Sequence, residues 1–512
     1  MERDPVTPGP ALHGAAGDGP VAGPATVELP RRRRITVLLI CCMSLVIVGM
    51  DNTIVNVALP SIGRDFHATV SGLQWTVDAY LLVLASLLML SGSMADRFGR
   101  RRTFQVGLAL FTLGSFLCSL APNLALLVVF RMIQAVGGSM LNPVAMSIIR
   151  NTFHDPRERA QAIGIWGAVV GVSIALGPVL GGVLVESVGW RSIFWVNIPI
   201  GLAAIVLTAR YVPESRALHA RSIDAVGQIL IIVVLGSLTY SIIEGPNAGW
   251  TSPTIVALLV VFATALAALL WFEPRQHEPL LDLRFFRSLP FSGATVIAVA
   301  AFAAFSGFLF LNTLYLQDAR GLSALDAGLY TLPMAAMTIV ASPISGWLVG
   351  RSGARASLVV AGTALTAGSL MLTGLTVSTP VGWLLAAYLV FGVGFGFVNP
   401  PITNTAVSGM PPSQAGVAAA VASTSRQVGQ SLGVAIIGVA ATAGLTGAIG
   451  PDLARASHSG WWIITGCSVL VLVLGVLSTT GRAHRSAEQV NVLFGNDADR
   501  VGVTRAASAA VG

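Results

Sequence analysis

Fourteen apolar runs, each long enough to cross a lipid bilayer as a helix, alternate with short polar connections along the 512-residue chain. A membrane-spanning helix takes about 20 apolar residues, and lipid offers the backbone no hydrogen-bond partners, which favours helices. Only 10% of the residues are charged and 54% are hydrophobic, unlike an ordinary soluble domain. We therefore predict an all-α integral membrane protein with spans at residues 35–59, 74–95, 104–121, 124–149, 161–185, 193–210, 223–243, 254–272, 291–315, 327–349, 357–378, 382–407, 416–445 and 460–480.

The distribution of arginine predicts which side of the membrane each connection faces. If the N-terminus is cytoplasmic, twenty-one arginines near helix ends fall on the inner side, and four fall on the outer side. Membrane proteins keep an excess of positive residues in their cytoplasmic loops. We therefore expect a multi-pass protein of the cytoplasmic membrane with both termini in the cytoplasm.

An internal repeat divides the chain into two similar halves. Gly92, Arg97, Gly99 and Arg101 recur after 254 residues as Gly346, Arg351, Gly353 and Arg355, and Asn142-Pro143 has a counterpart in Asn399-Pro400. Packed internal repeats are a common architecture of transporters that work by alternating access. We predict a 6+2+6 arrangement with a disordered cytoplasmic tail at 1–34, an N-terminal six-helix bundle at 35–210, two inserted helices and a cytoplasmic linker at 211–290, a C-terminal six-helix bundle at 291–480 and a cytoplasmic tail at 481–512.

Several classes of function are excluded by residues that are missing. All 30 basic residues are arginine, so the lysine-containing phosphate loop of ordinary P-loop ATPases is absent. The arginines lie in short groups between apolar runs, which argues against a nucleic-acid partner. The four cysteines lie in apolar runs and the histidines in tails or loops, so we predict no metal site. With no nucleophile and base pair evident, we expect neither a cofactor nor enzymatic activity.

Asp51 is the clearest candidate for a functional side chain. It lies about two-thirds of the way along the first apolar run, where a charge costs about 2.5 to 3.5 kcal/mol on insertion scales. Burial penalises the charged form of a carboxyl group and favours reversible protonation. We predict that Asp51 binds a transported proton; the alternative is a structural ion pair that never titrates.

Three further charged residues lie inside apolar runs. Asp78 lies near the outer end of the second run, where water could reach it, and is either a second carboxylate for protons or cations or an interfacial acid with a structural partner. Arg131 and Arg426 stay charged at all physiological pH values. We predict Arg131 as the partner of Asp51, with a hydrogen-bonded brace between helices as the alternative, and Arg426 as the charge of the C-terminal bundle.

The fifth apolar run contains a dense series of small residues. Gly164, Gly177, Pro178, Gly181 and Gly182 belong to it, and small residues in membrane helices let another helix approach closely. We therefore expect a neighbouring helix against this run.

These motifs resemble those of a known family. Gly92-x-x-x-Asp96-Arg97-x-Gly99-Arg100-Arg101 is similar to the loop signature of the major facilitator superfamily, and Gly164 to Gly182 is similar to its antiporter motif, with Ser173 in a glycine position. Arg131 with Gln134 and Gly137 resembles the helix 4 motif, with Ala135 in its usual glycine position. The segments Asp51–Pro60, Trp190–Pro199 and Arg426–Gly429 look like the fourteen-helix drug:proton antiporter family.

The resemblance implies an exporter that moves small lipophilic or cationic drugs out of the cytoplasm in exchange for protons. It also implies that the Asp96-Arg97 loop latches the outward-facing state, whereas simple positive-inside anchoring would explain the arginines but not Asp96. A dedicated exporter of one endogenous metabolite and a proton-coupled uptake transporter remain alternatives. We expect protons, a small lipophilic substrate and membrane lipid as partners, and a monomer as the functional unit.

Overall fold

The structure is a computed structural model, and it describes residues 29–217, 223–276, 279–408, 410, 414–443 and 452–494. All regular secondary structure in these ranges is helical. Several helices begin at a side chain that accepts a hydrogen bond from the first turn, as Thr69, Asn123 and Asp155 do for the helices that follow them.

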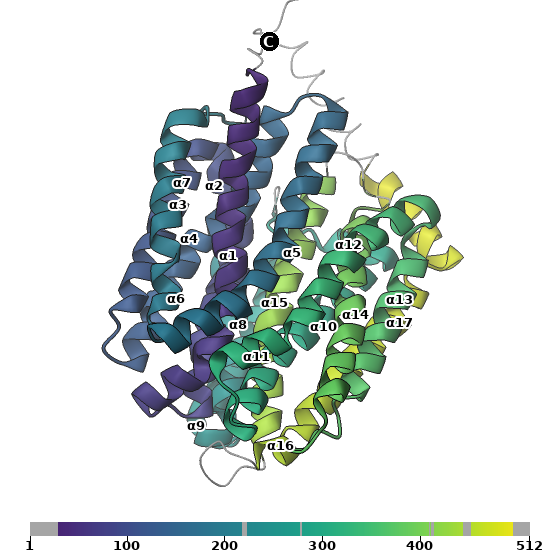
Figure 1. Ribbon diagram of the computed structural model, residues 1–512. Coiled ribbons are helices and arrows are strands. Elements are labelled where there is room, and N and C mark those ends of the chain that lie inside the picture. Colours follow the sequence, from purple (N-terminus) through teal and green to yellow (C-terminus); the bar gives the residue numbers. More distant parts are fainter. Residues whose placement is uncertain are drawn as a thin grey trace, which may run out of the picture.

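The first group of helices corresponds to the predicted N-terminal bundle (Figure 1). The long helices α1, α2 and α4 contact one another, while α3 packs on α4 and α7 and α5 packs on α1. The bounds in this group are α1 Arg31–Phe66, α2 Val70–Phe98, α3 Arg100–Ser119, α4 Leu124–Thr152, α5 Pro156–Ser187, α6 Ser192–Trp195 and α7 Asn197–Tyr211.

The second group mirrors the first. Helix α10 packs on α15 and α17, and α14 packs on α12 and α13. The bounds are α10 Leu289–Leu314, η3 Tyr315–Ala319, α11 Ala324–Tyr330, α12 Leu332–Ser352, α13 Ala354–Leu370, α14 Val381–Val407, α15 Ala415–Thr442, α16 Leu453–Ala456 and α17 His458–Leu477.

Two helices lie between these groups in the sequence and at their seam in space. They are α8 (Ala225–Ala248) and α9 (Pro253–Phe272), followed by the short helices η1 (Glu273–Arg275) and η2 (Leu283–Arg287). Helix α8 contacts α2 of the first group and α15 of the second, and α9 packs on α8. The inserted pair therefore covers the α2–α15 seam.

The predicted repeat is visible in the two sharp connections at one end of the molecule. Gly99 joins α2 to α3 with φ +108°, and Gly353 joins α12 to α13 with φ +79°. Backbone at positive φ favours glycine, which explains why both positions carry it. We call this end the arginine-rich end, because Arg97 and Arg100–Arg102 lie there, and the opposite end the Asp65 end.

Among the described residues, eleven helices are long and apolar enough to cross a membrane, by length and composition. Each of the fourteen predicted runs overlaps a helix, but three fall short of this criterion. Helix α3 begins with three arginines, α13 has only 17 residues, and α15 is rich in Ser, Thr, Gly and Gln. The fold is thus multi-helical as predicted, while the count of fourteen spans stays a prediction.

The N-terminal tail ends earlier than predicted, and part of the predicted C-terminal tail is a helix. Arg31–Arg34 form the first turn of α1, and residues 481–494 are helical and attached to the molecule. The backbone N–H of Leu289 donates to Ser486 Oγ at 2.9 Å, and the Phe494 ring lies 5.2 Å from that of Phe285. The disorder predicted for residues 1–28, and the tail predicted for 495–512, lie outside the described residues.

Candidate functional site

Asp51 and Arg131, predicted as partners, form a fully buried ion pair. Arg131 Nη1 lies 2.5 Å from Asp51 Oδ2, and the two side chains are 1% and 0% exposed. Helix α1 supplies the carboxylate and α4 supplies the guanidinium. The pairing itself is therefore as predicted, and a role in proton transfer stays a prediction.

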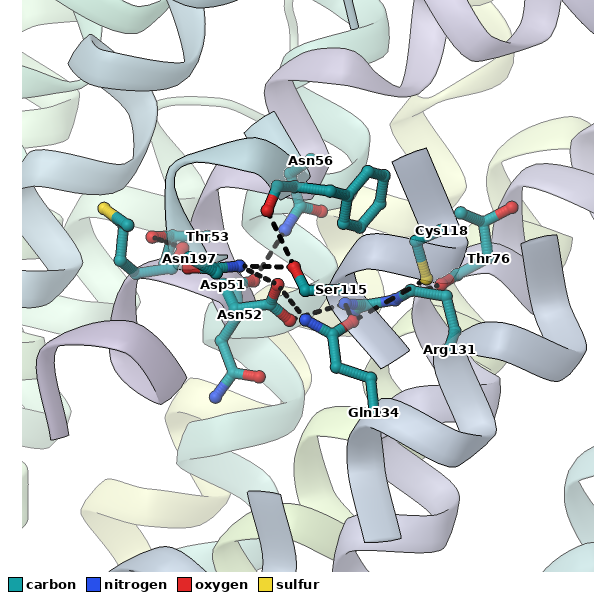
Figure 2. Close-up of polar contacts among 12 residues, drawn as sticks. Asp51, Asn52, Thr53, Asn56, Thr76, Ser115, Cys118, Arg131, Gln134 and Asn197 are labelled. Atoms are coloured by element: carbon teal, nitrogen blue, oxygen red, sulfur yellow. Dashed lines mark hydrogen bonds and ion pairs between the residues drawn. The ribbon is translucent and has the colours of Figure 1, made fainter. Parts of the chain in front are cut away.

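Amide side chains complete the bonding of the Asp51 carboxylate (Figure 2). Gln134 Nε2 donates to Oδ1 at 2.8 Å, and Asn197 Nδ2 donates to the same oxygen at 3.2 Å. Asn197 also donates to Ser115 Oγ, whose hydroxyl donates to the Phe194 carbonyl. The network joins α1 to α3, α4 and α7 within the first bundle.

Arg131 has partners besides Asp51. Its Nη1 donates to Gln134 Oε1 at 2.8 Å and its Nε to the Thr76 carbonyl at 3.3 Å. The guanidinium carbon lies 4.2 Å from the ring centre of Tyr80, within the range of a cation–π interaction. Arg131 would thus keep three favourable contacts if Asp51 became neutral.

Asp78 lies toward the Asp65 end of α2, as expected, but it is not accessible to water. It is fully buried, and neither carboxylate oxygen has a hydrogen-bond partner. Its side chain faces Ser431 of α15 across the seam between the bundles. One turn earlier, Gln74 Nε2 donates to the Val434 and Ala435 carbonyls at 3.0 and 2.9 Å. In this conformation water does not reach Asp78, because α15 covers the face of α2 on which it lies.

A cavity of about 1330 Å³ lies between the two bundles. Its lining extends from Asn52 of α1 and Phe302 of α10, near mid-height, to Asp96 and Arg150 at the arginine-rich end. Drug-sized ligands occupy pockets of about 300–1,000 Å³, so the cavity can hold one. The repeated pairs Asn142-Pro143 and Asn399-Pro400 line opposite walls.

Asp51 is sealed from this cavity although its neighbours line it. Gly49 and Asn52 belong to the lining, whereas Asp51 points into the first bundle. A residue advances about 100° around a helix, so adjacent positions of α1 serve the cavity and the buried network. This proximity could not be predicted from the position of Asp51 in its apolar run.

The phenylalanines of α10 divide between two environments. Phe302 and Phe305 line the cavity, with Phe305 stacked on Phe395 at 3.9 Å between ring centres. Phe308 and Phe310 are fully buried within the second bundle. Phe308 packs against Trp461.

The opposite end of the cavity is closed by contacts between the bundles. Gln317 Nε2 donates to the Val57 carbonyl at 2.9 Å in a buried position. Arg64 lies 3.7 Å from Asp318. Sequence reasoning missed Gln317, although a glutamine directly after an apolar run was a usable signal.

The small residues of α5 contact other helices near the Asp65 end and line the cavity near the arginine-rich end. A Cβ added to Gly182 would lie 2.6 Å from Leu325 Cα, and one added to Gly181 would lie 2.8 Å from Ile54 Cγ1. Gly177 packs still more closely on Thr53, and the Pro178 carbonyl contacts Gly328 of α11. A Cβ added to Gly164, in contrast, would meet no other part of the described chain within 4 Å, and Gly164 lines the cavity. Close approach of another helix is thus confirmed near the Asp65 end and wrong at Gly164.

The predicted gating loop contacts itself and the segment that follows α7. Asp96 pairs with Arg100 at 2.8 Å, and its carbonyl accepts from the Ala217 N–H. The N–H of Arg101 donates to Glu214 Oε1, close to Gly99. Arg97 lies in the last turn of α2. Gly92 and Asp96 line the cavity. In this conformation the loop is anchored to residues 212–217.

Arg426 differs from Arg131 in having no acidic partner in the described part of the chain. It lines the cavity, donates to Ser423 Oγ at 3.2 Å and to Thr403 Oγ1, and its Nε has no partner.

Trp190 and Arg191 hold the Asp65 end of the first bundle together. The indole N–H donates to Asp65 Oδ2 at 3.0 Å, and Arg191 Nη1 lies 2.8 Å from the same oxygen. Asn197 of the same motif serves the Asp51 network. Its polar side chain in an apolar run was the signal that could have placed it there.

Two helical bundles around a cavity that opens at one end define a membrane transporter. Residues 41–434 match the family model described as Major Facilitator Superfamily, and the chain belongs to this superfamily. It is a multi-pass membrane protein.

Curated relatives carry names of drug and antibiotic resistance. The chain is 38% identical to the multidrug resistance protein Stp of Mycobacterium tuberculosis, over 83% of this chain and 79% of that one. It is 39% identical to the tetracenomycin C resistance and export protein of Streptomyces glaucescens, over 78% and 75%. It is 35% identical to a methylenomycin A resistance protein of Streptomyces coelicolor, over 80% and 86%. The relationship to drug-efflux members of the superfamily, predicted from the motifs, is confirmed.

Solved transporters share the fold at low sequence identity. A bacterial homolog of the human lysosomal transporter Spinster, in an inward-facing and unoccupied conformation, has a TM-score of 0.60 at 18% identity, over 91% of this chain and 98% of that one. A D-xylose–proton symporter has a TM-score of 0.62 at 14% identity, over 86% and 97%.

Proposed function

We propose that this protein exports small lipophilic compounds across the cytoplasmic membrane in exchange for protons. The observation that carries the proposal is the Asp51–Arg131 pair, which is buried in one bundle and lies directly beside the wall of the central cavity. A buried carboxylate with an arginine partner in a membrane helix is a candidate proton relay. Asp51 is the proton site in this proposal, and Arg131 stabilises its charged form.

The surroundings of Arg131 support a titrating Asp51. Removing one partner of a buried ion pair costs about 3–5 kcal/mol when the other charge is left without compensation. Protonation of Asp51 removes its charge in the same way. Arg131 would keep Gln134, the Thr76 carbonyl and the Tyr80 ring, so the cost is smaller than for an isolated pair.

Helix α1 offers a route from the proton to the closed end. Asp51 faces the buried network, while Thr53 and Ile54 pack against Gly177 and Gly181 of α5. Because α5 in turn contacts α11, a small shift of α1 on protonation reaches the contact between the bundles. In the proposed cycle, the substrate enters from the arginine-rich end and a proton enters from the Asp65 end after that end has opened.

Asp78 is the second candidate for protonation. It has no partner and lies at the α2–α15 seam, which must separate when the Asp65 end opens. A neutral Asp78 favours the closed seam, because an unpaired buried charge is costly. In this proposal Asp78 takes up a proton while the Asp65 end is open and stays neutral in the half of the cycle in which the cavity faces the arginine-rich end.

The remaining parts of the proposal concern topology. The chain crosses the membrane fourteen times, the arginine-rich end and both termini face the cytoplasm, and the monomer is functional. The excess of arginine at that end supports this orientation. A reporter active only outside should work when inserted at Gly249 or Gly321 and fail at Gly99 or Gly353.

Export of one self-made metabolite is the second candidate function. The 39% identity to a protein named for resistance to and export of one compound, tetracenomycin C, favours a narrow range of cargo. The two functions differ in the range of compounds moved, and the mechanism proposed above is the same for both.

Inverted membrane vesicles test the proposal, because their cytoplasmic face is outside. We expect an acidified lumen to drive a panel of lipophilic dyes, Nile red among them, into the vesicles, and an uncoupler to abolish the accumulation. Vesicles containing Asp51→Asn should not accumulate dye. Movement of dye out of the lumen together with protons would contradict antiport and favour uptake.

A further inference from the structure

Arg426 is a cation in the wall of the central cavity with no carboxylate to balance it. No acidic group of the described residues lies within ion-pair distance of it. Its partners are the hydroxyls of Ser423 and Thr403, and its Nε is unpaired. Ionisable residues inside membrane helices are costly, and those without a structural counter-charge mark substrate pathways.

The two intramembrane arginines serve as a comparison within one molecule. Arg131 of the first bundle is 1% exposed, is paired with Asp51 and does not line the cavity. Arg426 of the second bundle lines the cavity and lacks such a partner. An ion pair with a buried acid explains Arg131, and the same explanation does not apply to Arg426.

The charges around the cavity are separated along its depth. Asp96, Arg150 and Asp224 line the mouth, where Asp96 is already paired with Arg100. At mid-height, where Asn52 and Phe302 lie, Arg426 is the charged residue of the described lining. A substrate that reaches the inner part of the cavity thus meets positive charge.

Flat aromatic surfaces lie next to this charge. The Arg426 guanidinium carbon is 5.9 Å from the centre of the Phe302 ring. Phe305 and Phe395 stack at 3.9 Å with an interplanar angle of 8°, and all three rings line the cavity. Gln427 adds an amide oxygen that lacks a hydrogen-bond donor. Parallel rings suit a planar conjugated ligand, and the arginine suits an anionic oxygen on it.

We propose that Arg426 binds the acidic group of a planar aromatic substrate, so that the exporter's preferred cargo is an organic anion, such as a carboxylate or phenolate. The sequence suggested neutral or cationic cargo instead. The inference rests on the proposed efflux function, since it names the substrate class of the same cavity. A brace from α15 to Thr403 of α14 is the alternative role of Arg426.

Three probes with the same ring system test the proposal. Anthracene-9-carboxylate is anionic, its methyl ester is neutral, and anthracen-9-ylmethylammonium is cationic. Binding to the purified full-length protein in nanodiscs is measured by fluorescence anisotropy. We expect the wild type to bind the carboxylate at least about 10-fold more tightly than either other probe, as a charge-assisted hydrogen bond would provide.

Variants separate recognition from bracing. Arg426→Gln should remove the preference for the carboxylate while binding of the ester changes little, and Arg426→Lys should restore part of it. Thr403→Val removes the hydroxyl of the brace and should leave the preference unchanged. Equal loss of all three probes in Arg426→Gln, with no rescue by lysine, would show a brace and overturn the proposal.

The wild-type comparison decides the question even if Arg426→Gln does not fold. Equal binding of the three probes, or tighter binding of the ammonium, contradicts anion recognition. Transport is measured separately in vesicles with an acidic lumen. A carboxylate that binds with preference but is not moved by the proton gradient would refute the efflux function alone. A driven ester with no preference for the carboxylate would refute the anion assignment alone.

Discussion

Asp51 and Asp78 are both buried carboxylates, but their surroundings differ. Asp51 has an arginine and two amide donors, whereas Asp78 has no hydrogen-bond partner. The sequence identified both as intramembrane acids. It could not distinguish them, because the groups that surround each acid come from helices that are distant in the chain.

The pairing with Arg131 predicts how the pH dependence of transport will change. Arg131→Ala removes the cation that pairs with Asp51, so we expect the pH optimum of transport to shift by about one unit or more. Dye transport measured from pH 6 to pH 9 checks this. A lower rate at an unchanged optimum would favour a structural brace.

Neutral substitutions of the two acids should have opposite effects on stability. Asp51→Asn removes the charge that balances Arg131 and should destabilise the protein, by less than the roughly 3–5 kcal/mol of an uncompensated buried pair, because Arg131 keeps its contacts with Gln134 and Tyr80. Asp78→Asn removes a buried carboxylate without partners and should leave the melting temperature at or above that of the wild type. Thermal unfolding in one detergent compares the two variants. An equal fall of the melting temperature in both would refute the difference between the two acids.

At the scale of elements, α5 contacts the second bundle at the closed Asp65 end and lines the cavity at the other end. Its glycines near the Asp65 end contact α1 and α11, whereas Gly164 faces open space. The motif predicted close helix packing along the whole run. It could not show that one half would be unpacked, because that depends on which end of the transporter is closed.

A side chain at Gly182 should therefore disfavour the conformation described here. The added Cβ would lie 2.6 Å from Leu325 Cα, a backbone atom that cannot move aside as a side chain could. In Gly182→Val, spin labels on cysteines introduced at Val188 and Leu329 should show a longer distance than in the parent. Gly164→Ala, placed in open space, is the matched control and should leave the distance unchanged. An unchanged distance in Gly182→Val would contradict the proposed closing contact between α5 and α11.

At the scale of the whole molecule, the repeat and the apolar runs predicted two similar helical groups, and the structure contains them. The sequence did not predict the direction in which the cavity opens or the sealing of Asp51 from it, since both depend on the relative positions of the bundles. It also missed the helix at 481–494, whose polar surface resembles that of a solvated tail.

The driving force available depends on the charge of the cargo. A membrane potential is worth about 2.3 kcal/mol per charge per 100 mV. One inward proton exchanged for one outward anion moves two charges down the potential, whereas a neutral cargo moves one. In vesicles with an imposed potassium potential, the equilibrium gradient of anthracene-9-carboxylate should depend on voltage twice as steeply as that of its ester. Equal slopes would contradict net anion export.

Simultaneous recording of proton and substrate movement tests the central claim most directly. In proteoliposomes with an acidic lumen, substrate added outside should enter while a pH dye reports protons leaving the lumen. In Asp51→Asn, exchange of labelled for unlabelled substrate should continue while the substrate-induced proton signal disappears. An equal proton signal in Asp51→Asn, or wild-type transport that ignores both pH and voltage, would contradict a proton cycle through Asp51.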